Sequence, residues 1–236
     1  MLESTDLQQV LILDIETVPQ FACYDELPSH FKELWELKTQ YARKENETAE
    51  EYYPRAGIWA EFGKIVCISV GIFTKQNEQL CLRVKSFAGD NECEILSDFI
   101  ALLSKQPANL SLCAHNGKEF DFPYLCRRTL ISGLCIPSQL RLSGKKPWEV
   151  SHIDTMDLWK FGDYKSFTSL SLLAAVFDIP TPKDDINGSD VYRVYWHEKD
   201  LERIKTYCQK DVITTAQLLL KFKGLPLINN EQIIIV

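Results

Sequence analysis

The chain has 236 residues, 33 of them acidic and 26 basic, and a formal net charge of −7 at pH 7. This balance argues against a protein that grips long duplex nucleic acid through a broad basic face. The length suits one α/β domain, residues 1–236, with a large core. No apolar run approaches 18 residues, so we expect no membrane association through a spanning helix.

The cysteines and the first residues indicate a cytoplasmic protein. None of the eight cysteines forms a Cys-x-x-Cys pair, which argues against a zinc site, and several lie in apolar stretches that suggest reduced core residues. The opening Met-Leu-Glu-Ser-Thr-Asp is acidic and polar, so we expect no signal peptide.

The first predicted strand, Val10 to Glu16, reads Val-Leu-Ile-Leu-Asp-Ile-Glu and is typical of a strand buried on both faces. Strand side chains alternate, so Asp14 and Glu16 share a face. Two bare carboxylates so close repel each other, and a divalent cation removes that conflict. The alternative is a solvated strand end, because such a triplet occurs about once by chance in a chain this acidic.

A second acidic motif follows a predicted strand at residues 110–114. Asn116-Gly117 breaks that strand, and a helix then carries Leu125 to Leu130. Asp121 falls near the start of this helix, where the helix dipole favours an acid. Ordinary capping is the alternative for Asp121, and a turn with left-handed dihedrals is the alternative for Asn116.

The third motif is Tyr207-x3-Asp211, within one long helix predicted over 199–221. Apolar residues recur along this helix at a spacing of three to four, at Leu201, Ile204, Cys208, Val212, Thr215 and Leu219. Asp211 borders that stripe and so faces inward, where acids are rare unless paired or bound to metal. Tyr207 lies on the same face, four residues earlier, and a plain Tyr–Asp hydrogen bond is the alternative.

In this order, the three motifs resemble those of the tyrosine-bearing branch of the DEDD exonuclease superfamily. The chain is most similar to predicted 3′-5′ exonucleases related to the proofreading domain of family-B DNA polymerases, from about residue 8 to 222. Further similarities lie at Phe62–Gly71, His152–Leu158 and Ile179–Val191. The resemblance implies a ribonuclease-H-like α/β fold with a mixed five-stranded sheet. It matches Asp14, Glu16, Asp121 and Asp211 to four metal-binding acids and Tyr207 to the catalytic tyrosine.

Two-metal phosphodiester hydrolysis needs two ions about 3.5–4 Å apart, and Mg²⁺ or Mn²⁺ with oxygen ligands would suit it. We expect Asp14 to bridge the ions, Glu16 and Asp211 to complete the nucleophile side, and Asp121 to serve the leaving-group side. With an unperturbed pKa near 10, Tyr207 is better suited to position the attacking water than to act as a base. The candidate substrate contacts are Thr17, Asn116, Phe120, Lys145, Lys146 and Trp148.

The remaining elements alternate as in an α/β domain. We expect a hairpin of strands 64–74 and 79–87, an amphipathic helix at 92–103, a short last strand at 150–154 and an apolar helix at 169–177. The helix at 92–103 should turn Ile95, Leu96, Phe99, Ile100 and Leu103 inward.

Three segments stay open to two interpretations each. The helical insertion at about 21–62, with a helix near 27–41 and a charged run at 43–51, is either a solvated flap or a lid over the substrate. The segment 140–150 is either a plain exposed loop or a single-strand contact through its lysines and Trp148. The tail at about 224–236 ends in Ile-Ile-Ile-Val and either adds a strand to its own sheet or pairs with a partner.

The sequence therefore predicts a metal-dependent 3′-5′ exonuclease acting on single-stranded ends, with DNA preferred on resemblance alone. An exoribonuclease and a catalytically idle nucleic-acid-binding or scaffold domain are the alternatives. An endonuclease of the same fold is disfavoured by the Tyr207–Asp211 pair. The negative charge predicts weak free affinity, or dependence on a protein partner in DNA metabolism.

Overall fold

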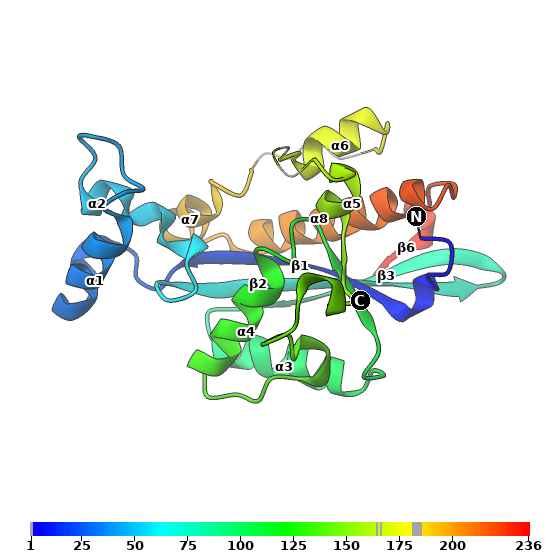
Figure 1. The fold of residues 1–236 in the computed structure, drawn as a ribbon, viewed down its shortest axis with the longest axis horizontal. Coiled ribbons are helices and arrows are strands. Elements are labelled where there is room, and N and C mark those ends of the chain that lie inside the picture. The colour runs from blue at the N-terminus through cyan, green and yellow to red at the C-terminus, as the bar shows by residue number, and fades with distance from the viewer. Residues whose placement is uncertain (1, 164, 166, 181–185) are drawn as a thin grey trace.

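A computed structural model describes residues 2–163, 165, 167–180 and 186–236 (Figure 1). Part of the segment 179–191 singled out in the sequence, residues 181–185, lies outside the described residues. Among the described residues, no helix has the length and apolar character needed to cross a bilayer.

The centre of the fold is a mixed sheet of six strands in the order β5-β4-β1-β2-β3-β6. Neighbours β1–β2 and β2–β3 are antiparallel, whereas β1–β4, β4–β5 and β3–β6 are parallel. The strands are β1 Val10–Pro19, β2 Gly63–Gln76, β3 Gln79–Ala88, β4 Ser111–Ala114, β5 Ile153–Asp154 and β6 Ile233–Ile235.

This mixed α/β sheet is the ribonuclease-H-like architecture expected, but the prediction of five strands was wrong by one. The sixth strand is β6, supplied by the C-terminal tail, which pairs parallel to β3 with Leu82 opposite Ile233. The tail thus covers an edge of its own sheet. The strand expected at 150–154 shortens to Ile153–Asp154.

Helices cover both faces of the sheet, and the bounds of the main ones agree with the sequence patterns to within a few residues (Figure 1). The helices are α1 Ser29–Thr39, α2 Ala49–Tyr52, α3 Glu92–Ser104, α4 Asp121–Ile131, α5 Thr155–Lys160, α6 Leu170–Val176, α7 Val191–Arg193 and α8 Leu201–Phe222. A π-helical turn, Val194–Glu198, joins α7 to the loop before α8.

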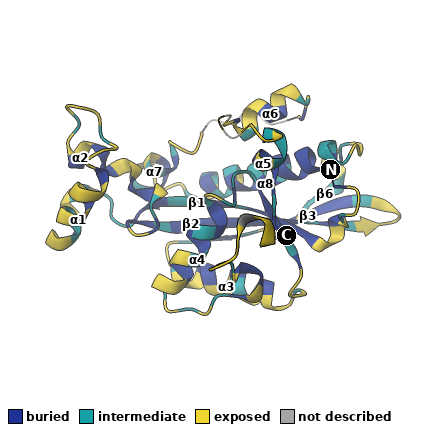
Figure 2. Ribbon diagram, in the orientation of Figure 1, coloured by how far each residue is buried: buried dark blue, intermediate teal, exposed yellow. Residues whose placement is uncertain are grey.

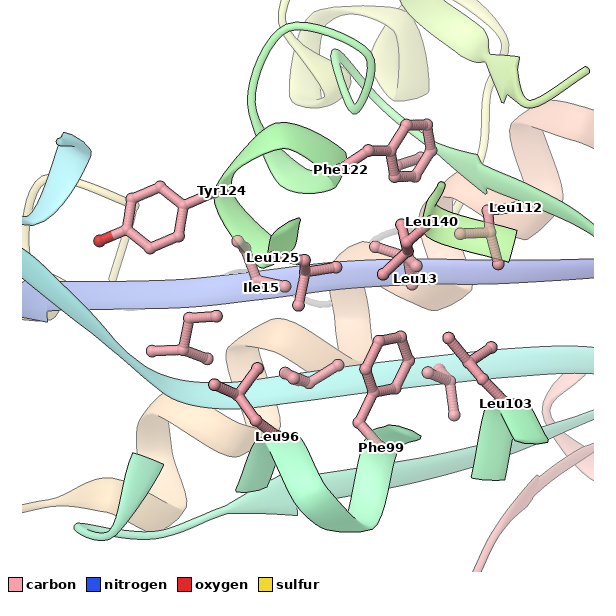
Figure 3. Packing of buried hydrophobic residues seen from close by; sticks show 14 of the residues in the cluster. Leu13, Ile15, Leu96, Phe99, Leu103, Leu112, Phe122, Tyr124, Leu125 and Leu140 are labelled. Carbon is pink, nitrogen blue, oxygen red and sulfur yellow. The ribbon is translucent and has the colours of Figure 1, made fainter. Parts of the chain in front are cut away.

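Two cores lie on opposite faces of β1 because its side chains alternate. Leu13 and Ile15 pack with Phe99 of α3 and Leu125 of α4 on one face (Figure 3). Ile12 packs with Val212 of α8 on the other. In Figure 2 the sheet is dark blue between helices whose outer faces are yellow. The long helix α8 is therefore held directly against β1.

The β2–β3 hairpin has a two-residue turn. Asn77 and Glu78 have φ values of 48° and 62°, the left-handed conformation that suits the twist of a tight hairpin. The turn is shorter than the four residues expected from the sequence, because both strands extend toward it.

The insertion between β1 and β2 builds a small aromatic core of its own at one end of the sheet (Figure 1). Trp35 of α1 is fully buried there, and its indole N–H donates to the Ala49 carbonyl at 2.8 Å. Lys44, Glu45, Glu50 and Glu51, from the charged run, are exposed. Exposed charges are compatible with both a solvated flap and a lid over the substrate.

Candidate metal centre

The two acids of β1 interrupt an apolar seam between this strand and α8. Ile12 belongs to the cluster around Val212, and Val18 belongs to a second cluster around Cys208. Asp14 and Glu16 lie between these two positions on the same face of β1. The carboxylates therefore point toward α8, at a place where burial would otherwise favour apolar side chains.

A thiol holds the helix against this acidic pair. Cys208 donates from Sγ to the backbone carbonyl of Asp14 at 3.4 Å. One oxygen of Asp14, one oxygen of Glu16 and this Sγ all lie within 4.8 Å of one another. Cys208 was expected only as part of the apolar stripe, so its role at the site is a feature that the sequence reasoning missed.

The carboxylate of Asp121 joins the group from the first residue of α4. It is 4% exposed, and its Oδ1 accepts a hydrogen bond from the Ile15 amide at 3.2 Å, between the two acids of β1. The parallel pairing of β1 with β4, which puts Ile12 opposite Cys113, brings the turn after β4 to this point.

Asp154 on β5 fixes that turn. Its two carboxylate oxygens accept hydrogen bonds from the Asn116 and Lys118 amides, both at 3.0 Å. Asn116 has a φ of 65°, as its turn interpretation expected. Asp154 also caps α5 through the Met156 amide. An acid at a strand end just before a helix was the available signal for this residue, which the sequence analysis did not select.

Charge interactions connect all four acids. Burial raises the pKa of Asp14 well above its usual value, and the charges of Glu16, Asp211 and Asp121 raise it further. Burial likewise raises the pKa of Glu16, with Asp211 the largest charge contribution. Burial raises the pKa of Asp121 to about 7 against the effect of its backbone hydrogen bonds. Asp14 and Glu16 are thus close together, and the charges of Asp121 and Asp211 act on both, which disfavours ionisation of all four acids at once.

Tyr207 lies beside this cluster, one turn before Asp211 on α8. Burial raises the pKa of its phenol, and the charges of Asp211 and Glu16 raise it further. A hydrogen bond between Tyr207 and Asp211 acts in the same direction. The phenol therefore stays protonated and can donate.

The other sequence candidates have different surroundings. The Thr17 hydroxyl donates to the Gly57 carbonyl at 2.8 Å, which ties β1 to the insertion. Phe120 packs into the core on the α4 side, with its ring 5.3 Å from that of Tyr124. Asn116 has a buried Oδ1 that accepts no hydrogen bond from the described residues.

The lysines and the tryptophan of the segment 140–150 have contacts with other residues. The side chain of Trp148 is exposed, with the Lys146 ammonium 5.2 Å from its ring centroid. Burial lowers the pKa of His152, and the charge of Lys145 lowers it further. The His152 ring accepts a hydrogen bond from the Leu112 amide near the beginning of β4.

The donor set fits a hard divalent cation. Asp14 Oδ2 is buried and accepts no hydrogen bond from the described residues, so it has a free lone pair inside the cluster. Four carboxylates supply the oxygen ligands that Mg²⁺ and Mn²⁺ prefer. The Cys208 thiol does not compete, because burial raises its pKa and its proton is donated to the Asp14 carbonyl.

Comparison with known families gives an independent result. A family described as predicted 3′-5′ exonucleases related to the exonuclease domain of PolB matches residues 58–227. The match includes Asp121, Tyr207 and Asp211, whereas Asp14 and Glu16 come before its first residue. The fold brings β1, which carries these two acids, against the matched region through β2, β4 and α8. The match spans well over half of the chain and agrees with the resemblance seen in the sequence, so the chain belongs to this family of predicted exonucleases.

Proposed function

We propose that the protein is a metal-dependent 3′-5′ exonuclease that hydrolyses the last phosphodiester of a single-stranded DNA end. Membership of an exonuclease family implies a nucleic-acid substrate. The finer proposal is supported by Asp14 and Glu16, which lie side by side on β1, and by Asp121, which accepts a hydrogen bond from the amide between them. The charges of Asp121 and Asp211 also act on both acids of β1, and those of Asp14, Glu16 and Asp211 act on Tyr207.

Each acid has a role suited to its position. Asp14 is central in the cluster and has an oxygen without a hydrogen-bond donor, so it would bridge two divalent ions. Asp211 makes the largest charge contribution to the raised pKa of Glu16, and these two acids would hold the ion on the nucleophile side. Asp121 would serve the leaving-group side. Bound divalent ions would supply a more acidic water and neutralise charge developing on the phosphate.

Tyr207 is proposed to orient the attacking water. Its phenol is too weak an acid to be ionised near neutral pH, so it acts as a hydrogen-bond donor or acceptor. Asp211 holds that hydroxyl from the next turn of the helix. The effect of Tyr207 on the attacking water depends on the direction of its hydrogen bond, so a small displacement of α8 would weaken this effect.

The proposed function can be tested with strands of one sequence, made as DNA and as RNA, labelled at the 5′ end. We expect the full-length protein to shorten the DNA from its 3′ end with Mg²⁺ or Mn²⁺ and to leave it intact with EDTA. Faster shortening of the RNA would make the protein an exoribonuclease.

Two controls distinguish the other classes. A 3′-phosphate should slow digestion, and an unchanged rate with internal cuts would indicate an endonuclease. The variant Asp14→Asn should remove the activity of the same preparation. Binding without hydrolysis in every metal would indicate a catalytically idle domain.

A further inference from the structure

A pocket lies on the same face of the sheet as the acidic cluster, beyond the end of the acidic pair. It has a volume of about 360 Å³ and is lined by Lys64, Asp90, Tyr195, Trp196, Lys199 and Leu201. Lys64 on β2 is opposite Val18 of β1, two residues past Glu16. Two strand residues span about 7 Å, so the pocket begins close to the carboxylates.

A shared apolar floor connects the two places. Tyr207, Trp196 and Leu201 all pack against the cluster around Val18 and Cys208. Trp196 and Leu201 line the pocket, and Tyr207 adjoins the acids. A strand leaving the acids along this face would therefore reach Trp196.

Trp196 is a fixed platform for two cations. Its indole N–H donates to the Pro19 carbonyl at 3.1 Å, which anchors the ring to the last residue of β1. The Lys64 ammonium lies 5.1 Å from the centre of this ring and the Lys199 ammonium lies 4.8 Å from it. Two ammonium groups are thus gathered at one aromatic ring, in a chain whose net charge is −7.

The two lysines differ in the hydrogen bonds and ion pairs that they make within the protein. Lys64 donates to the Tyr195 hydroxyl at 2.8 Å, and that hydroxyl donates to Asp90 at 2.7 Å. Lys199 makes no ion pair within the ranges that the structure describes. With Asp90 counted against the two lysines, the pocket keeps one formal positive charge.

The backbone around the pocket has an uncommon conformation. Val194–Glu198 forms a π-helical turn, which places Tyr195 and Trp196 side by side, and Lys199 follows with a φ of 57°. Single π-helical turns are frequently found at functional sites, and a left-handed lysine has a conformational cost. This geometry turns Lys199 back over the indole.

We propose that this pocket binds an upstream phosphodiester, with its base, of the same single strand whose 3′ end lies at the acids. The inference rests on the proposed function, since a 3′ end held there leaves only nucleotides on the 5′ side to reach Trp196. The lysines would hold the phosphate, and the indole would stack with the base, as in other single-strand grooves.

The variant Lys199→Asn tests the phosphate contact. Asparagine tolerates the left-handed backbone and removes the charge, so the fold should be preserved. Binding is measured by fluorescence anisotropy with a 5′-fluorescein thymidine 12-mer and Mg²⁺, on an Asp14→Asn background that suppresses hydrolysis. We expect the Kd to rise about fivefold. The slope of log Kd against log salt should fall by about 0.7, the value for one phosphate of a single strand.

Two further variants serve as a second probe and a control. Lys64→Met keeps the aliphatic stem and should also weaken binding and lower the salt slope. Lys75→Ala removes a lysine at the exposed far end of the same strand β2 and should change neither quantity. Values for Lys199→Asn and Lys64→Met that match those of Lys75→Ala would overturn the proposal.

The length of the strand separates an upstream phosphodiester from a free nucleotide. The loss in Lys199→Asn should be larger for the 12-mer than for a thymidine dinucleotide, and equal losses would overturn the proposed path. Thymidine monophosphate that competes through Lys199 while the 12-mer is unaffected would assign the pocket to free nucleotides instead. Loss of 12-mer affinity in a protein that hydrolyses no strand would support the pocket and reject the exonuclease, whereas hydrolysis with unchanged affinity would do the reverse.

Discussion

Asp14 is the central acid of the proposed metal site, and few groups of the protein stabilise its negative charge. The charges of Glu16, Asp211 and Asp121 act on its side chain, and its Oδ2 accepts no hydrogen bond within the described part of the chain. An acid in such surroundings lowers the stability of the folded protein unless it is protonated or bound to a cation. This cost suggests that the residue is kept for binding and not for folding.

Asp14→Asn is therefore expected to abolish hydrolysis and to stabilise the metal-free protein. The substitution keeps the shape of the side chain and removes one of the repelling charges. Activity on a 5′-labelled strand should fall at least about 10³-fold. The melting temperature in EDTA should rise or stay unchanged. A marked fall in that temperature would show that the carboxylate supports the fold.

Tyr207→Phe should lower turnover about 10²–10⁴-fold, the usual contribution of a positioned proton-transfer or hydrogen-bonding group. The phenyl ring keeps its packing against the Cys208 cluster, so the melting temperature and the Mn²⁺ affinity should change little. Asp211→Asn should instead weaken Mn²⁺ binding. Single-turnover hydrolysis and Mn²⁺ titration of both variants separate the two roles. Wild-type turnover in Tyr207→Phe would make the tyrosine a structural residue.

At the scale of the elements, the site depends on how closely α8 approaches the sheet. Gly71 pairs with Ile12, and a Cβ placed on it would lie 2.8 Å from Cγ1 of Val212, next to Asp211. Glycine here allows the helix to lie directly on β2.

Gly71→Ala is expected to push α8 away from the sheet and to destabilise the protein by about 1–3 kcal/mol. Since Asp211 and Tyr207 are on the same helix, turnover should fall as well. Urea unfolding and single-turnover assays measure the two effects. Gly188→Ala is the matched control, because its Cβ would meet nothing within 4 Å. Equal stabilities of the two variants would contradict the close packing described.

The elements that carried local signals were predictable from the sequence, and those that depend on distant pairing were not. Alternation placed Asp14 and Glu16 on one face of β1, and the helical stripe placed Asp211 at its inner edge. The hydrogen bond from the Ile15 amide to Asp121 spans 106 residues and follows from β1–β4 pairing, which no local pattern encodes. The same holds for Asp154. The sequence offered the tail as an added strand of its own sheet, but no local pattern identified β3 as its partner.

For the molecule as a whole, the raised pKa values make the stability of the metal-free protein depend on pH. Asp121 has a pKa of about 7 in the folded protein and near 3.8 when unperturbed. The folded state thus binds a proton more tightly than the unfolded state does, so this contribution is full below about pH 4 and is lost as pH rises through 7. Asp14 and Glu16 act in the same direction.

Without divalent ions, the free energy of unfolding should therefore fall between pH 5 and pH 8, by an amount on the order of a few kcal/mol. Mn²⁺ should restore more stability at pH 8 than at pH 5, because it favours the ionised carboxylates. Urea unfolding with EDTA or Mn²⁺ at the two pH values measures this. The variant Asp121→Asn should show a smaller pH dependence. A metal-free stability that rises from pH 5 to pH 8 would contradict the mutual repulsion of the acids.

The most direct test of the central claim is anomalous diffraction from a crystal of the full-length protein soaked in Mn²⁺. The account predicts manganese peaks among Asp14, Glu16, Asp121 and Asp211, with two ions about 3.5–4 Å apart when a single-stranded 3′ end is bound. It also predicts no such peaks in a crystal of Asp14→Asn. A fully soaked wild-type crystal without manganese between these carboxylates, or with Asp14 and Asp211 too far apart to share an ion at ligand distances near 2 Å, would contradict it.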